Sequence, residues 1–300
     1  MFRLDIDFKP RLKNVIITSM KGVSGTGPGI GAHQRMSGER KAVLFRGKGL
    51  EFEKYRQFTP DDDAQMIDWK ATLRAHKMLV KMYSEEQNKD IITFFDVSSS
   101  MSYSSIGKLK NEYAAELIAS LVLNIVEAGD NAGLIMFNEK IVKVMPPLSG
   151  IGQYHNIMSM LSNPKLYDGK FNLVRSLYQL MGVLKRQAII LLVSDFIGLS
   201  GEWKRALEIM STKFELIGIM VRDPADNKLP LAKAQIVTSD PFSDEELLVD
   251  PLRVAEEYER INQERIREIQ ILFRKMRSDL LILQTDQDFA GPVRKFFMGV

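Results

Sequence analysis

The sequence predicts an α/β protein in which helices flank a mainly parallel β-sheet, with a β-rich extension before it. From residue 91 onward, short apolar runs alternate with longer segments of helical periodicity, which is the pattern of βαβ units. Two of these runs, residues 91–95 and 188–193, are apolar or β-branched throughout, as strands buried on both faces are. With 300 residues, 45% of them hydrophobic, the chain is long enough to bury such a core.

The remaining elements follow in order along the chain. Residues 108–127 carry an apolar stripe at three- and four-residue spacing and form a deeply packed helix. A pair of β runs at 234–238 and 246–249 comes before a long helix that begins at Pro251, where the missing N–H of proline costs nothing. Further strands are expected at 132–138, 141–145, 214–221 and 280–283, and further helices at 151–161, 173–184 and 202–212.

We divide the chain into three parts. Residues 1–88 are the β-rich extension, residues 89–290 the sheet domain, and residues 291–300 a C-terminal tail. The first 50 residues hold ten Lys and Arg against three Asp and Glu, a basic arm that we interpret as a solvated surface, because no nucleic-acid-binding module accompanies it. The glycine-rich segment 22–31 lacks the Gly-Lys-Ser/Thr ending of a phosphate-binding loop and is expected to be a flexible linker.

The composition argues against several classes of protein. The absence of Cys removes disulfides and thiolate sites and fits a reducing compartment. No Gly-x-Ser-x-Gly elbow accompanies the three histidines, His33, His76 and His155, so a Ser-His-Asp hydrolase is not predicted. The first ten residues lack the apolar core of a signal peptide, and no window approaches the ~20 apolar residues of a membrane helix. We therefore expect a cytoplasmic protein without a transmembrane segment.

The candidate site lies at the ends of the two apolar runs. The first run stops at Asp96 and continues as Val97-Ser98-Ser99-Ser100, so one carboxylate and two hydroxyls can converge on a hard divalent cation such as Mg²⁺ or Mn²⁺. The second run ends in Asp195, which is expected beside Asp96 because open α/β sheets collect ligands at the carboxyl ends of their strands. The competing interpretation of Asp96, Ser98 and Ser100 is a polar turn that caps the next helix.

These motifs resemble the von Willebrand factor A fold, a Rossmann-like sheet domain with a metal-ion-dependent adhesion site. Upstream, Gly49-Leu50-Glu51-Phe52-Glu53-Lys54-Tyr55-Arg56-Gln57-Phe58-Thr59-Pro60-Asp61-Asp62-Asp63 and then Ile67-Asp68-Trp69-Lys70 resemble the signature of the prokaryotic domain-of-unknown-function family fifty-eight. Members of that family pair the signature with a von Willebrand factor A-like domain. The resemblance runs from about Lys48 to Asp286 and implies a metal site formed by Asp96, Ser98, Ser100 and Asp195.

The chain departs from the pattern of the adhesion site at one ligand. The family places a threonine in the loop before the third helix, and this loop reads Asp168-Gly169-Lys170-Phe171-Asn172. Phe171 therefore replaces the hydroxyl ligand, and only Asp168 or Asn172 could compensate. The resemblance implies a degenerate site with weakened affinity for metal.

The upstream signature also differs from the family pattern. Pro60-Asp61-Asp62-Asp63 replaces the usual Pro-Gly-Asp-Asp, and Gln65 replaces an arginine. We interpret the charged residues of this region as an ion-pair and capping network that braces the extension against the sheet domain. The residues of this network are Arg56, Asp62, Asp63, Asp68 and Arg74.

The leading functional hypothesis is a non-enzymatic adaptor, in which a bound cation keeps a coordination position open for a partner's Glu or Asp. The resemblance implies a MoxR-type AAA ATPase as partner, in protein maturation or complex assembly. One alternative is a metal-independent scaffold whose pocket Phe171 fills. Another is a metal-dependent phosphohydrolase with Asp96 as nucleophile, disfavoured because Ser98 stands where the haloacid-dehalogenase enzymes have an acidic proton donor.

Overall fold

The computed structural model of the chain describes residues 4–8, 11–12, 50–59, 62–85, 88–184, 187–229, 235–243 and 246–298. These residues belong to two compact units, one of residues 29–88 and the other of residues 1–28 together with 89–300. We call them the signature unit and the sheet unit. The glycine-rich segment 22–31 lies outside the described residues.

The signature unit is a two-stranded antiparallel ribbon with a short helix. Strands β1 (Leu50–Gln57) and β2 (Leu79–Glu85) pair with a register shift between Phe52 and Lys54. A 3-10 turn, η1 (Ala64–Met66), and helix α1 (Trp69–Ala75) connect them.

Part of the predicted polar network is present inside the signature unit. The Asp68 carboxylate caps α1 by accepting the N–H groups of Lys70 and Ala71 at 3.0 and 3.1 Å, and it also accepts the hydroxyl of Tyr55 at 2.9 Å. Arg56 forms an ion pair with Asp62. That these residues brace the unit against the sheet domain stays a prediction.

The sheet unit contains a six-stranded sheet in the order β10-β7-β6-β3-β4-β5. All pairs are parallel except β4–β5, which is antiparallel at one edge. The predicted α/β fold class, with a mainly parallel sheet flanked by helices, is therefore confirmed. The strands are β3 (Asp90–Asp96), β4 (Asn131–Phe137), β5 (Ile141–Leu148), β6 (Ile189–Ser194), β7 (Glu215–Arg222) and β10 (Asp279–Gln284).

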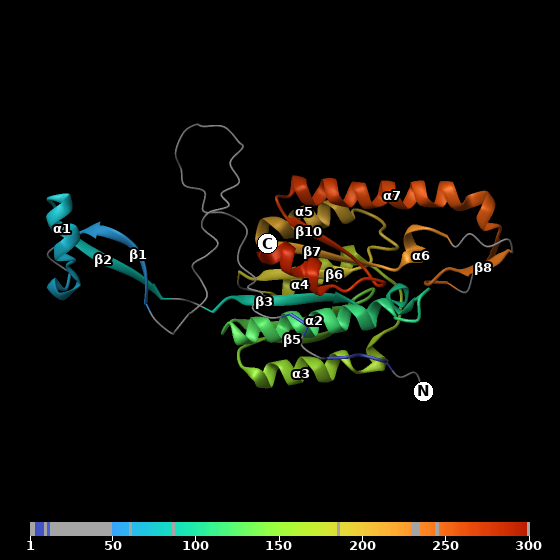
Figure 1. Cartoon of the computed structure of the whole chain (residues 1–300), viewed down its shortest axis with the longest axis horizontal. Coiled ribbons are helices and arrows are strands. Elements are labelled where there is room, and N and C mark those ends of the chain that lie inside the picture. Colours follow the sequence, from blue (N-terminus) through green and yellow to red (C-terminus); the bar gives the residue numbers. More distant parts are fainter. Residues whose placement is uncertain are drawn as a thin grey trace. The chain divides into compact units, whose positions relative to one another are not determined.

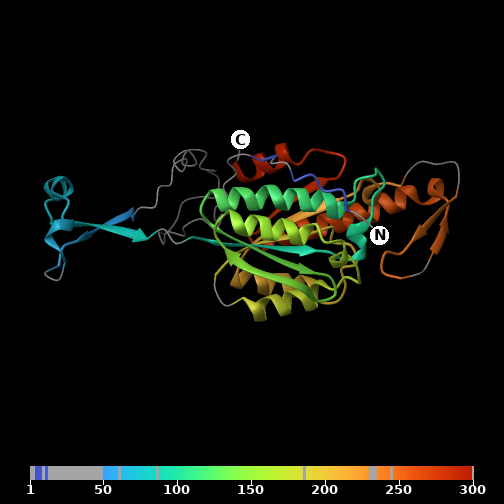
Figure 2. The same ribbon diagram turned by 90° about the horizontal axis from the view of Figure 1, so that it is seen from below.

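Helices cover both faces of this sheet (Figures 1 and 2). Alternate side chains of β3 point to opposite sides, so Ile91 and Phe95 join the core under α2, α3 and α8, whereas Ile92 and Phe94 join the core under α4, α5 and α7. Strands β3 and β6 are buried on both faces of the sheet, which explains the uninterrupted apolar runs in the sequence. The helices are α2 (Lys110–Glu127), α3 (Ile151–Leu161), α4 (Leu173–Val183), α5 (Trp203–Lys213), α7 (Pro251–Lys275) and α8 (Ala290–Met298).

Several short elements lie at the carboxyl edge of the sheet or in the connections between its strands and helices. The 3-10 helix η2 (Ser99–Ser102) follows β3, and helix α6 (Pro224–Asn227) follows β7. The 3-10 helix η3 (Pro164–Leu166) joins α3 to the loop before α4. Strands β8 (Ile236–Ser239) and β9 (Glu246–Val249) form an antiparallel hairpin between α6 and α7, close to the predicted β runs.

The order of the strands reverses beside β3. The chain runs from β3 outward through β4 to β5, and then returns to β6 on the other side of β3. In open α/β sheets, ligands bind at the carboxyl ends of the two strands that flank such a reversal. The register aligns Phe95 with Val193, so the ends of β3 and β6, with Asp96 and Asp195, meet at this point.

Both ends of the chain depart from the predicted division. Residues 4–8 and 11–12, which we assigned to the extension, belong to the sheet unit, where the N–H groups of Asp5 and Asp7 donate to Glu112 and Glu116 of α2 at 2.6 and 2.7 Å. At the other end, most of the predicted tail is helix α8, whose Val293 is buried. Gly291 and Pro292 do not prevent a helix here because they lie in its first turn, where proline loses no hydrogen bond.

We predict that the Gly218→Ala variant is less stable than the wild type by about 1–3 kcal/mol, because the added methyl group overpacks the core. A Cβ at Gly218 in β7 would lie 2.6 Å from Phe273 Cε1 and 2.7 Å from Leu280 Cδ1. Urea unfolding measures the change. The control is Gly182→Ala on the exposed side of α4, where nothing lies within 4 Å, and it is expected to leave stability unchanged or to raise it by up to ~1 kcal/mol. Equal unfolding midpoints for the two variants would contradict this account.

Candidate metal centre

Asp96 ends β3 and is completely buried. Its Oδ1 accepts the N–H of Ser98 at 2.9 Å, and its Oδ2 accepts the hydroxyl of Ser194 at 2.6 Å. The carboxylate thus supports the turn after the strand, as the competing interpretation expected. The Ser98 side chain, however, makes no capping hydrogen bond to η2.

The two serine hydroxyls of the motif face each other. Ser98 and Ser100 are buried, and their Oγ atoms lie 3.2 Å apart. Oxygens that occupy neighbouring positions around Mg²⁺, each at about 2.1 Å from the ion, are separated by about 3 Å. The spacing of the two hydroxyls therefore suits a hard cation, with Asp96 as the charged ligand beside them.

Asp195 lies at the same edge of the sheet, directly after β6, and is also completely buried. Its Oδ1 accepts the N–H of Ile197 at 2.8 Å, and its Oδ2 accepts the ammonium group of Lys110 at 2.7 Å. All four predicted site residues thus lie at one edge, at the ends of the adjacent strands β3 and β6 or in the turn after β3. Asp195 differs from Asp96 because its charge is already balanced by a lysine.

Lys110 is a residue of this site that the sequence did not reveal. It is the first residue of α2, its side chain is 1% exposed, and its ammonium group also binds Asp226 Oδ2 of α6 at 2.9 Å. Burial by itself would lower the pKa of Lys110, but the charges of Asp195 and Asp226 outweigh it and raise this pKa above its ordinary value. The side chain is therefore a permanent cation at the edge of the sheet.

The carboxyl group of Asp96 has the opposite electrostatic character. Burial and the charge of Asp195 raise the pKa of Asp96 to about 7, against the effect of the hydrogen bonds from Ser194 and Ser98. Among the residues that the structure describes, no basic side chain forms an ion pair with it. A divalent cation would supply the missing positive charge, so the donor set of Asp96, Ser98 and Ser100 fits such an ion.

This donor set is rich in hydroxyls rather than in charged ligands. Within the described ranges, no group of three or more His, Cys, Asp or Glu side chains is arranged to hold a metal ion. Asp195 can join Asp96 as a ligand only by sharing its carboxylate with Lys110 or by giving the lysine up.

Phe171, which stands where the resemblance places a threonine ligand, packs in an aromatic layer. Its ring centroid lies 6.2 Å from that of Phe137 and 6.5 Å from that of Phe242, which comes from the turn between β8 and β9. The ring of Phe242 covers Gly198, three residues after Asp195, where a Cβ would lie 2.7 Å from it. An apolar wall therefore stands on this side of the candidate centre.

Asp168 and Asn172, the two residues that could compensate for the missing threonine, have different places. The side chain of Asn172 accepts the N–H of Arg175 at 2.9 Å and caps α4. Asp168 accepts the hydroxyl of Ser99 at 3.1 Å, and the N–H of Ser99 donates to the carbonyl of Gly169 at 2.9 Å. Asp168 is thus the candidate that hydrogen bonds hold next to the motif.

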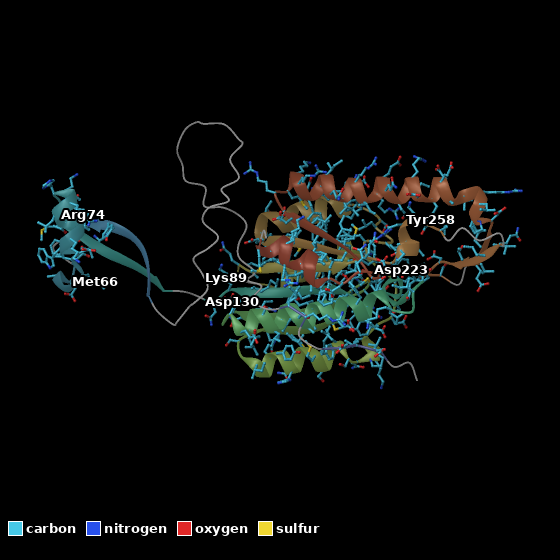
Figure 3. The ribbon with its side chains drawn as sticks, in the orientation of Figure 1. Met66, Arg74, Lys89, Asp130, Asp223 and Tyr258 are labelled. Atoms are coloured by element: carbon cyan, nitrogen blue, oxygen red, sulfur yellow. The ribbon has the colours of Figure 1, made fainter. Side chains whose placement is uncertain are left out.

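The site occupies one end of the sheet unit. Figure 3 shows Asp223 and Tyr258 at this end and Lys89 and Asp130 at the opposite end. The N–H of Lys89 donates to Asp130 Oδ1 at 3.0 Å, where β3 and β4 begin. The two ends therefore correspond to the carboxyl and amino edges of the parallel strands.

Comparison with known proteins identifies the family. Residues 54–268 match a family described as "Protein of unknown function DUF58", and because the match covers more than half of the chain, this protein belongs to that family. Two relatives are the uncharacterized proteins Rv1480 from Mycobacterium tuberculosis and Mb1516 from Mycobacterium bovis. Each is 23% identical over 257 residues, which cover 84% of this chain and 80% of the relative.

Solved structures show more distant similarity. The conserved hypothetical protein BatB from Bacteroides thetaiotaomicron has a TM-score of 0.45 and 14% identity, with 68% of this chain and 94% of that chain covered. A von Willebrand factor type A structure from Catenulispora acidiphila has a TM-score of 0.33 and 15% identity, over 48% of this chain and 35% of that one. Separately, none of the helices in the described residues is long and apolar enough to cross a membrane.

We predict that Asp96 makes the protein less stable as the pH rises from about 4 to about 7 in the absence of divalent cations. Because the pKa of the folded state lies above that of the unfolded state, the folded protein binds this proton more tightly. The stabilisation is complete below about pH 4 and is lost as the pH passes about 7, by up to about 4 kcal/mol.

Unfolding in EDTA across this pH range measures the effect, with Asp96→Asn as the control because its side chain is neutral at every pH. The free energy of unfolding of the wild type should fall relative to that of the variant. Parallel profiles for the two proteins would show that Asp96 does not titrate in this range.

Proposed function

We propose that this protein is a non-enzymatic adaptor that binds a protein partner through a divalent cation, Mg²⁺ or Mn²⁺, at the carboxyl edge of its sheet. The proposal rests on Asp96, a buried carboxylate with no cation paired to it among the described residues. It lies beside two serine hydroxyls whose oxygens are 3.2 Å apart, at the point where the strand order reverses. The family has no known function, and nothing in its description or in the names of the relatives indicates catalysis.

The residues of the site would contribute different ligands to the cation. Asp96 supplies negative charge, and Ser98 and Ser100 supply neutral oxygens, so the set neutralises only part of a divalent charge. When bound, the cation would offer an open coordination position to a partner's Glu or Asp. The low dielectric around Asp96 would strengthen attraction between that carboxylate and the site.

A MoxR-type AAA ATPase is the partner class that we propose, with protein maturation or complex assembly as the process. The support for it is the resemblance of residues 48–286 to a family whose members are often encoded beside such ATPases. The family match over residues 54–268 agrees with the extent of that resemblance.

A second candidate function is a scaffold that binds partners by shape without metal. Two observations favour it: Lys110 already balances the charge of Asp195, and Phe171 packs against Phe137 and Phe242 where the family has a hydroxyl ligand. In this case the rim of the sheet would be the binding surface, with Asp96 kept protonated below neutral pH.

We predict that Asp96→Ala abolishes binding to the MoxR-type ATPase in a pull-down with Mg²⁺ present, and that EDTA abolishes binding by the wild type. The variant should fold, because removing Asp96 leaves no buried cation unpaired and costs only the acceptor for Ser98 and Ser194, about 1–3 kcal/mol. The matched control is Glu127→Ala at the far end of α2, which should bind normally. Undiminished binding of the wild type in EDTA would contradict the metal-dependent mechanism.

Calorimetry separates the adaptor from the scaffold without a partner. We predict that titration of the wild type with millimolar Mg²⁺ or Mn²⁺ gives saturable binding of one ion, and that Asp96→Ala gives none. The neutral hydroxyls and the charge of Lys110 predict weak affinity. No binding of either ion to the wild type would select the scaffold.

A further inference from the structure

We propose that Lys110 is an internal counter-cation that competes with a divalent ion for Asp195, and that Asp226 decides the competition by holding the ammonium group. This inference rests on the proposed metal centre and concerns its regulation. It is carried by a buried cluster of three charged side chains that come from three different elements, α2, the end of β6, and α6.

The cluster consists of one cation shared by two carboxylates. Lys110 Nζ lies 2.7 Å from Asp195 Oδ2 and 2.9 Å from Asp226 Oδ2. The three side chains are 1%, 0% and 8% exposed, so water contributes little to their charge balance. At such short distances in a poorly solvated site, the ammonium group is bound strongly by both partners.

Asp226 is fixed in place independently of Lys110. Its Oδ2 also accepts the N–H of Asp223 at 2.9 Å, which closes the capping box of α6. Its backbone carbonyl accepts Arg222 Nη2 at 2.7 Å. A carboxylate anchored in this way can keep the ammonium group when Asp195 releases it.

Arg222 does not take over the role of the lysine. Its guanidinium donates to the backbone carbonyls of Asp195 and Asp226, at 3.2 and 2.7 Å. It therefore fixes the main chain of both segments. In the part of the chain that the structure describes, the ion pairs of the Asp195 and Asp226 carboxylates are both with Lys110.

Two arrangements of the cluster follow from this geometry. In the first, which the structure shows, the ammonium group of Lys110 is shared and offsets part of the negative charge of Asp195. In the second, Asp195 turns its Oδ2 from Lys110 toward Ser98 and Ser100, and Lys110 remains paired with Asp226 alone. The flexible four-carbon stem of lysine permits the small shift that this exchange needs.

Lys110 and Asp226 therefore act on metal affinity in opposite senses. Removing Lys110 frees Asp195 and raises the affinity of the centre for Mg²⁺. Removing the charge of Asp226 leaves Asp195 as the sole partner of the ammonium group, which binds it more tightly and lowers the affinity. An ion cluster with a purely structural role would lose stability in both variants without this opposition.

The test is calorimetric titration of the full chain with Mg²⁺, comparing the wild type with Lys110→Met and Asp226→Asn. We expect affinity to rise by roughly tenfold or more in Lys110→Met and to fall by a similar factor in Asp226→Asn, as for loss or gain of one close charge contact. The control is Lys108→Met, because Lys108 is two residues away and pairs with Glu116 at 2.6 Å instead. Its affinity should match the wild type.

Lys110→Met alone leaves two buried carboxylates without a cation, so this variant can fail to fold. The double variant Lys110→Met with Asp226→Asn tests the same inference with only one such carboxylate instead of two. It has the same net charge as the wild-type cluster, and it should bind Mg²⁺ more tightly than the wild type. The rise in unfolding temperature that Mg²⁺ causes in each protein is an independent measure of affinity, and it should rank the variants in the same order.

The outcomes distinguish this inference from the proposed function. Equal affinities in all variants, or a lower affinity after loss of Lys110, would overturn the inference and leave the metal centre standing. Binding by the variants that lack Lys110 but not by the wild type would support the inference and argue against metal-dependent adhesion by the wild type. No binding by any of the proteins would overturn both.

Discussion

The burial of two carboxylates at the point where the strand order reverses is the constraint on which the rest of this structure depends. The sheet places Asp96 and Asp195 at the ends of adjacent parallel strands, away from water, where an uncompensated charge is costly. The chain compensates them unequally. Asp195 receives the ammonium group of Lys110, whereas Asp96 receives only the neutral donors of Ser98 and Ser194. The same edge of the sheet therefore holds the ammonium group of Lys110 beside Asp195 and a carboxylate, that of Asp96, which has no cation paired to it in the described part of the chain.

The apolar wall beside the site follows from the same topology. The loop before α4 reaches the edge of the sheet, and hydrogen bonds between Ser99 and the Asp168–Gly169 segment hold it there. Phe171 lies two residues further on, and it joins the ring of Phe137 to that of Phe242 from the hairpin turn. These hydrogen bonds fix the position of the loop relative to the Ser98–Ser100 motif, and Phe171 gives the loop an apolar surface there.

The sequence alone predicted the sheet and the positions of Asp96 and Asp195 at its edge. The runs at 91–95 and 188–193 predicted β3 and β6 because strands that are buried on both faces lack polar interruptions, and parallel pairing then put Asp96 and Asp195 at one edge. Lys110 could not be predicted in this way. It sits in a helix whose apolar stripe gave the only signal, and its partners Asp195 and Asp226 lie 85 and 116 residues away. The docking of residues 5 and 7 on Glu112 and Glu116 escaped prediction for the same reason, since a backbone donor leaves no mark in the sequence.

The start of α2 is held by charges as well as by apolar packing. Along one side, the buried Glu116 binds Lys108 at 2.6 Å and Arg11 at 3.2 Å, and accepts the N–H of Asp7. Along the other side, Lys110 binds two buried aspartates. Each of these hydrogen-bonded pairs tolerates little displacement, so together they restrict the rotation and the axial position of the helix. The ammonium group of Lys110 is therefore delivered to the edge of the sheet by a rigid element, and any rearrangement of the cluster must come from the lysine stem and from Asp195 rather than from the helix.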